Sequence, residues 1–244
     1  MSPIRRARRR SSQAGVTTGF GLFPPMERNP PEICKNFGFR ARVSRRDFPI
    51  AANWLKEDTD MPDPRRTPLH ALHLELGAKM VSFAGYELPV QYPMGVMQEH
   101  QHTRAHAGLF DVSHMGQLSL TGDGVVEDLE ALLPASISSL AEGRMRYSLL
   151  LNEDGGVLDD LIVTNRGGSY SLVVNGSMKI QDIEHIRKHL SPATSLEHQR
   201  GQALLALQGP DAPGVLEDIV PGVSDLVFMT ASEFEWDGTS LWIS

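Results

Sequence analysis

The chain has 244 residues, 41% hydrophobic and 22% charged, a composition that excludes a wholly disordered chain, a collagen and a coiled-coil rod. No apolar run approaches the roughly 18 residues that a membrane-spanning helix needs. The single cysteine, Cys34, excludes an internal disulfide and a multi-cysteine metal site and fits a reducing compartment. The net charge of -7 is concentrated in residues 61–244, whose 11 Lys/Arg against 24 Asp/Glu disfavour broad nucleic-acid binding.

Residues 1–60 are basic, with 12 Lys/Arg against 6 Asp/Glu, and contain no acidic residue before Glu27. Their Arg- and Ser-rich opening is typical of an organelle transit peptide. Two alternatives remain. One is an upstream extension outside the mature protein, since foldable sequence begins directly after Met61, and the other is a basic nucleic-acid-binding arm. We therefore predict a non-globular basic extension over 1–60 and a folded part over 61–244.

Hydrophobic periodicity and turn residues predict an α+β body over 61–244. Helices are expected over residues 67–76, 95–107, 125–133, 178–190 and 210–220, the first capped by Thr67. Strands are expected over 80–84, 108–112, 117–121, 146–151, 157–165, 170–174, 203–207 and 226–230, with a strand–turn–strand over 235–244. The short connections favour antiparallel sheets with helices packed on one face.

The last residues form an apolar, strand-like segment, Leu241, Trp242 and Ile243. A chain that ends in the middle of a strand leaves an open sheet edge. We therefore expect a polypeptide that is cut short at its C-terminal end.

Asp159 and Asp160 are the polar pair that carries the most information. Neighbours on a strand point to opposite faces, and the apolar run 161–163 predicts burial on both faces, so at least one carboxylate should lie near apolar groups. A buried carboxylate needs a partner or its pKa rises, and such an acid can bind or relay a proton on a ligand nitrogen. The alternative is an acid that caps the turn at Gly155 and Gly156.

Histidines in the helix over 95–107 give a weaker signal. His102 and His106 have metal-ligand spacing, but His100 points elsewhere and no third ligand is obvious. A solvated helix face is the expectation, and no metal site is predicted. The glycine pairs of the chain match no phosphate-binding loop and are read as turns.

Two further clusters could carry chemistry. Asp111, Ser113 and His114 hold the three residue types of a catalytic triad, but triads are assembled from distant segments. Arg144 and Arg146 could bind a carboxylate or phosphate bidentately, or could be solvated.

Five segments, in this order and spacing, together resemble the T-protein (aminomethyltransferase) family of the glycine cleavage system. They are RTPL at 66–69, FAGYELPVQY at 83–92, AGLFDVSHM at 107–115, NEDGGVLDDLIV at 152–163 and ALLALQGP at 203–210. The resemblance implies the family's folate-binding fold, with 61–244 as an N-terminal portion truncated at its C-terminal end. The family's Tyr-Thr-Gly-Glu segment, a later arginine and a C-terminal β-barrel domain are missing.

The same resemblance implies a reaction and a set of residues. The family transfers the methylene of an aminomethyl group, carried on the dihydrolipoyl arm of H-protein, to tetrahydrofolate and releases ammonia. Asp160, the second acid of the Leu-Asp-Asp-Leu motif, would position and activate folate N5. Met115, Tyr147 and Asn175 would line the folate pocket, and Phe228 would pack beside the pterin, a flat ring that suits an apolar slot with a few aimed polar groups.

Sister families on this fold supply the alternatives. The folate domains of dimethylglycine and sarcosine dehydrogenases accompany a flavin domain, and this chain has no dinucleotide fingerprint. An iron–sulfur assembly relative lacks the acid at Asp160. A non-catalytic folate-binding or assembly protein, or an inactive fragment, is thus the alternative function, and weak folate binding with little turnover is expected from 1–244 alone. We expect a bacterial cytoplasmic location, or the mitochondrial matrix if 1–60 is a transit peptide, and neither a membrane nor a nucleic-acid partner.

Overall fold

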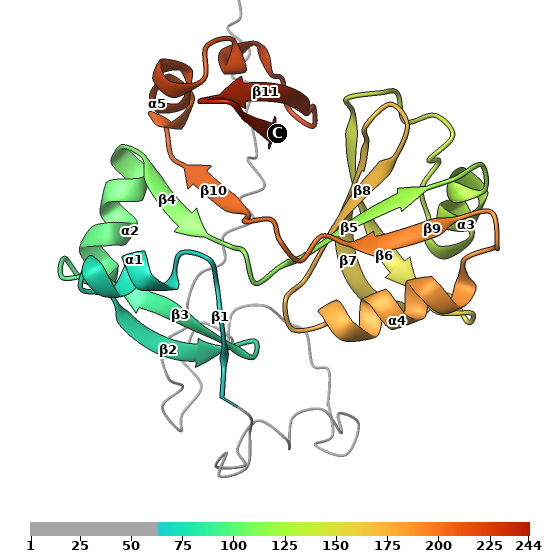
Figure 1. Cartoon of the computed structure of the whole chain (residues 1–244), viewed down its shortest axis with the longest axis horizontal. Coiled ribbons are helices and arrows are strands. Elements are labelled where there is room, and N and C mark those ends of the chain that lie inside the picture. The colour runs from blue at the N-terminus through green and yellow to red at the C-terminus, as the bar shows by residue number, and fades with distance from the viewer. Residues whose placement is uncertain (1–62) are drawn as a thin grey trace, which may run out of the picture. The chain divides into compact units, whose positions relative to one another are not determined.

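A computed structural model describes residues 63–244 (Figure 1), so the expectation for residues 1–60 lies outside the described residues. In the described part, no helix has the length and apolar character needed to cross a membrane. Its α-helices, with one short 3-10 helix, are α1 (His70–Glu75), α2 (Val96–Ala105), α3 (Val125–Leu132), α4 (Lys179–His189), α5 (Ala212–Ile219) and η3 (Val223–Asp225).

The largest sheet has five strands in the order β6-β7-β8-β5-β9, and every neighbouring pair is antiparallel. Its strands are β5 (Gly116–Thr121), β6 (Met145–Leu151), β7 (Val157–Asn165), β8 (Tyr170–Val174) and β9 (Ser195–His198). Because β5 precedes β6 in the chain but pairs with β8 and β9, the sheet is more than a simple meander. This order places β7, which carries Asp160, and β8, which ends directly before Asn175, in the interior of the sheet.

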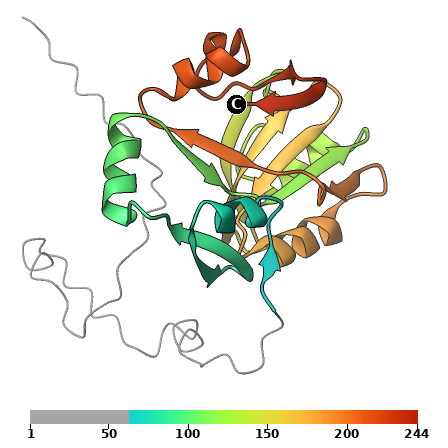
Figure 2. The same cartoon turned by 60° about the vertical axis from the view of Figure 1, so that its left-hand side comes forward.

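Three smaller sheets complete the described chain. Their strands are β1 (Arg65–Arg66), β2 (Lys79–Phe83), β3 (Tyr86–Gln91), β4 (Gly108–Asp111), β10 (Leu205–Gln208), β11 (Ser232–Trp236) and β12 (Thr239–Ile243). Strand β3 lies between β2 and a short parallel β1, and β11 pairs with β12. Figure 2 shows β4 and β10 side by side, a pairing that joins Asp111 to Leu205 across a long stretch of chain.

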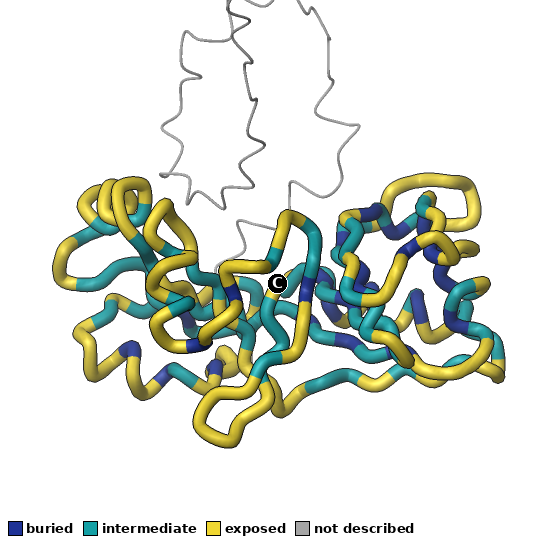
Figure 3. Tube along the Cα trace, turned by 90° about the horizontal axis from the view of Figure 1, so that it is seen from above, coloured by how far each residue is buried: buried dark blue, intermediate teal, exposed yellow. Residues whose placement is uncertain are grey.

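The core lies on one face of the five-stranded sheet. Strand residues at alternate positions, such as Leu118 and Leu120 on β5, are at most 1% exposed, whereas the positions between them are half-buried (Figure 3). Helices α3 and α4 pack on the buried face through Leu129 and Ile186, which are completely buried. Alternate side chains of the strands and the apolar stripes of α3 and α4 thus pack together in a single apolar layer.

The expected α+β architecture, with antiparallel sheets and helices on one face, is confirmed. The prediction that residues 161–163 are buried on both faces is wrong for Ile162, which is only half-buried. Its side chain lies on the face away from α3 and α4. The expected turn at Asp237 and Gly238 is confirmed, and both residues have positive φ, as a two-residue hairpin turn requires.

Three local predictions are wrong or incomplete. The expected strand over 226–230 is a turn, because Met229 has φ of 61° and the Thr230 N–H donates to the Val227 carbonyl. The first helix has Leu69 at its N-cap rather than Thr67. Strands β3 and β9 were not predicted, and β3 contains Pro89, a residue that disfavours strands.

Gly122, directly after β5, has a backbone conformation that can be tested by substitution. Gly122 has φ of 118°, and a Cβ added there would meet the carbonyl oxygen of Ala193. We predict that Gly122→Ala lowers the free energy of unfolding by about 1–3 kcal/mol, because alanine is strained at this φ. Gly168→Ala is the matched control, since an added Cβ there meets nothing within 4 Å. Equal denaturation midpoints for the two variants would contradict the prediction.

Candidate functional site

The sheet register decides which face Asp160 occupies. Asp160 lies opposite Leu149, and Tyr147 lies opposite Ile162, on the paired strands β7 and β6. Residues two apart on a strand share a face, so Tyr147 and Asp160 lie on the same face as the half-buried Ile162. Helices α3 and α4 pack on the opposite face of the sheet.

Asn175 follows β8 directly and joins the two acids. Its side-chain Nδ2 donates to Asp159 Oδ1 at 2.9 Å, to the Asp160 carbonyl at 3.2 Å and to Asp160 Oδ1 at 3.3 Å. The structure therefore brings Asn175 and Asp160 together, and one amide links carboxylates that belong to opposite faces of β7.

Tyr147 on β6 completes this group. Its side chain is 55% exposed, and loss of hydration, the charge of Asp160 and a hydrogen bond with Asp160 raise the pKa of the phenol above its usual value. The phenol is thus uncharged at neutral pH and can donate a hydrogen bond. A carboxylate, a phenol and an amide on one open face suit a flat ligand that offers ring nitrogens.

The other two predicted pocket residues lie at the edges of this group. Met115 is half-buried and directly precedes β5. Phe228 is 90% exposed and lies in the turn over 227–230. The Met145 N–H donates to the Met229 carbonyl at 2.9 Å, so this turn lies against the start of β6, two residues before Tyr147. Within residues 63–244, no aromatic contact holds the Phe228 ring.

Asp182 on α4 is a residue that the sequence reasoning missed. It is 2% exposed. Burial, a hydrogen bond with the Asp159 side chain and the charges of Asp159 and Asp160 raise its pKa to about 8. The signal that could have found it is an acid on the apolar stripe of a helix, since Asp182 and Ile186 are four residues apart and both are buried.

Lys179, at the start of α4, is a second residue that was missed. It is 3% exposed, and its Nζ donates to the Tyr86 hydroxyl at 2.8 Å and to the His114 carbonyl at 2.7 Å. The ammonium also lies 4.7 Å from the centre of the Tyr86 ring, a cation–π contact. Burial and the Lys179 charge lower the pKa of His114, so this imidazole is neutral at physiological pH.

The acid, hydroxyl and imidazole over 111–114 do not form a triad. Asp111 accepts a hydrogen bond from His73 Nε2 at 3.0 Å, and Ser113 Oγ accepts one from the Leu204 N–H at 3.0 Å. His114 packs edge-on against the Phe83 ring instead of facing Ser113. These contacts tie β4 to α1 and to the segment before β10.

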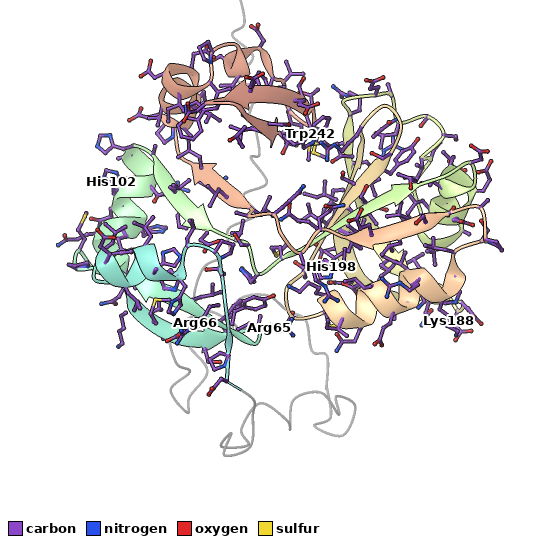
Figure 4. All side chains as sticks on the ribbon, viewed as in Figure 1. Arg65, Arg66, His102, Lys188, His198 and Trp242 are labelled. Carbon is purple, nitrogen blue, oxygen red and sulfur yellow. The ribbon has the colours of Figure 1, made fainter. Side chains whose placement is uncertain are left out.

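The helix histidines and the arginine pair have local partners. The ring centres of His102 and His106 lie 5.1 Å apart, and Figure 4 shows His102 on α2. His106 Nδ1 lies 3.1 Å from Asp211 Oδ2. Among residues 63–244, no group of three His, Cys, Asp or Glu is arranged to hold a metal ion. Arg146 donates to the Ser136 carbonyl, while Arg144 is exposed.

Comparison with known proteins assigns the family. Residues 69–244 match the family model described as the GCVT N-terminal domain. Over 176 residues the chain is 42% identical to the mitochondrial aminomethyltransferase of Dictyostelium discoideum, an alignment that covers 68% of this chain and 44% of that protein. It is 42% identical over 160 residues to the aminomethyltransferase of Rubrobacter xylanophilus, covering 65% and 43%.

A solved structure gives the same answer. The glycine cleavage system aminomethyltransferase T of Bartonella henselae matches with a TM-score of 0.67 and 43% identity, over 71% of this chain and 48% of that chain. The chain thus spans less than half the length of these relatives. It belongs to the glycine cleavage aminomethyltransferase family and carries that family's GCVT N-terminal domain.

Proposed function

We propose that this chain supplies the tetrahydrofolate-binding face of an aminomethyltransferase. The observation that carries the proposal is the hydrogen bond from Asn175 to Asp160, on the face of the five-stranded sheet that Tyr147 shares. The family's name supports the reaction class, and the open, partly apolar face with three aimed polar groups supports a pterin as the ligand. Residues 61–244 are then the N-terminal part of the folate-binding domain.

The proposed reaction transfers one carbon. Folate N5 attacks the methylene of the aminomethyl group on the dihydrolipoyl sulfur, the C–N bond breaks and ammonia leaves. Folate N10 then displaces the sulfur, which gives methylenetetrahydrofolate and the free dihydrolipoyl thiol. The two N–H protons of the folate end on the ammonia and the thiol, so no oxidant or reductant is needed.

The residues of the site have distinct roles in this proposal. Asp160 accepts a hydrogen bond from the N5–H and holds that nitrogen toward the methylene carbon. Asn175 restrains the Asp160 carboxylate through its amide, and the uncharged Tyr147 phenol donates to Asp160 or to the pterin. Met115 and Phe228 supply apolar contact for the ring.

The partner in the proposal is a lipoylated H-protein, which delivers the aminomethyl group. The Dictyostelium relative is a mitochondrial protein and the Rubrobacter relative is bacterial, which supports either the mitochondrial matrix or the bacterial cytoplasm as the location. Neither membrane nor nucleic acid is part of the proposed function.

Replacement of Asp160 is the most direct test. We predict that Asp160→Asn weakens tetrahydrofolate binding to the 244-residue chain at least 10-fold, since an amide cannot accept the N5–H as a charged carboxylate does. Calorimetric titration measures the change. Asp154→Asn is the matched control, because Asp154 is exposed in the turn before β7. Equal affinities for both variants would remove the role given to Asp160.

Replacement of Phe228 distinguishes a role in folate binding from a role in fold stability. Because its side chain is 90% exposed, Phe228→Ala should leave the free energy of unfolding within about 0.5 kcal/mol of the wild-type value. We predict that the same variant weakens tetrahydrofolate binding 3- to 10-fold by removing one face of the pterin slot. An unchanged affinity would place the pterin elsewhere.

The reaction itself is tested with lipoylated H-protein that carries the aminomethyl group. We expect methylenetetrahydrofolate and ammonia to form slowly and in equal amounts with the wild-type chain, in line with the little turnover expected from residues 1–244 alone, and Asp160→Ala to abolish their formation. Product formation that survives Asp160→Ala would contradict the proposed mechanism. Folate binding with no product would instead favour a non-catalytic folate-binding protein.

A further inference from the structure

Two acids face each other on the core side of the five-stranded sheet. Asp159 lies opposite Leu150, which is completely buried, and shares the face of Leu161 and Val163. Asp182 reaches the same side from α4, next to the buried Ile183, and is 2% exposed. A side-chain interaction with Asp159 is among the causes that raise the pKa of Asp182, and each acid has a buried Oδ2 atom without another partner among the described residues. A carboxyl pair therefore lies at the interface of β7 with α4.

No cation in the described part of the chain forms an ion pair with these two acids. The ion pairs found within residues 63–244 involve Glu87, Asp111, Asp211 and Glu153, and none includes Asp159 or Asp182. With both acids taken as ionised, Asp159 Oδ2 and Asp182 Oδ2 are buried atoms without a hydrogen-bond partner among the described residues. Two carboxylates in contact cannot both stay charged in such a place. A proton between them satisfies both atoms at once.

The charges around Asp182 agree with this assignment. Burial, the side-chain interaction with Asp159 and the negative charges of Asp159 and Asp160 on β7 all raise the pKa of Asp182. The nearby cation of its own helix, Lys179, is held by the Tyr86 hydroxyl and the His114 carbonyl. Asp128 on the adjacent α3 accepts hydrogen bonds from Ser191, so none of these groups supplies a positive charge to the pair.

We propose that Asp159 and Asp182 share a single proton between β7 and α4, and that this pair positions Asn175 for its contact with Asp160. The Asp182 hydroxyl donates to Asp159 Oδ2, which leaves Asp159 Oδ1 as a charged acceptor for Asn175 Nδ2, 2.9 Å away. The same Nδ2 then reaches Asp160. The value of this positioning for catalysis rests on the function proposed for Asp160, whereas the shared proton does not.

The proton has a definite pH range. In the unfolded chain Asp182 loses its proton near pH 3.8, and in the fold it keeps the proton to about pH 8. A pKa raised by folding means that the folded state binds more protons between these values, so stability declines as pH rises through this range. Above about pH 8 two anions face each other, and the contacts of Asn175 should change.

The titration can be observed without any ligand. In the 244-residue chain with carbon-13 at the aspartate carboxyl groups, we expect one buried carboxyl signal to titrate with a midpoint near pH 8. Asp182→Asn should abolish that titration, because its amide keeps a donor toward Asp159 but cannot ionise. Glu184→Gln, an exposed acid on the same helix, should leave the titration unchanged. Ionisation of every aspartate below pH 5 would overturn the shared proton.

A second reading tests the positioning role. The side-chain NH2 resonances of Asn175 should shift with the same midpoint in the wild-type chain and stay constant in Asp182→Asn. Asn175 resonances that do not follow the carboxyl titration would overturn positioning, even with the shared proton present. Because both readings are made without folate, a failure of tetrahydrofolate binding would count against the proposed function and not against the pair.

Discussion

The strict alternation of side chains along β7 is the constraint on which the rest of the site depends. Adjacent acids on a strand cannot share a face, so Asp159 is directed to the core side and Asp160 to the open side. The cover supplied by α3 and α4 on one face only then gives the two carboxylates different surroundings. A one-residue slip of β7 would exchange these environments.

Two buried ionisable groups on α4 show how the fold accommodates charge without salt bridges. Lys179 is held by a phenol oxygen, a carbonyl and an aromatic face, all of which stabilise a cation. Asp182 is buried beside other acids, so burial and the neighbouring Asp159 raise its pKa. Burial acts against the charged form of Asp182, and the neighbouring Asp159 and Asp160 add to that effect.

Much of the fold could be predicted because the local signals agree with it. The spacing of Val125, Leu129 and Leu132 marks α3, and glycine-rich turns delimit β6, β7 and β8. The strand over 226–230 failed for a specific reason. Its apolar residues suggested burial, but Phe228 is exposed and Met229 adopts a backbone conformation that breaks a strand.

Sequence reasoning identified some residues of the candidate site and missed others, for a physical reason. The contact of Asp160 with Asn175 links β7 to the end of β8, neighbouring strands joined by the turn at 166–168. The family resemblance named both residues, but sequence reasoning did not predict their contact. Asp159 and Asp182 come together only because α4, which begins four residues after Asn175, folds back over the sheet. The local sequence of α4 does not specify what Asp182 will contact. Strand alternation could therefore place the two acids on opposite faces of β7, while the buried surroundings of Asp159 depend on tertiary packing. In this chain a single amide, that of Asn175, joins the two. Under the proposed shared proton, the Asp160 carboxylate is thereby linked to a protonation site in the core.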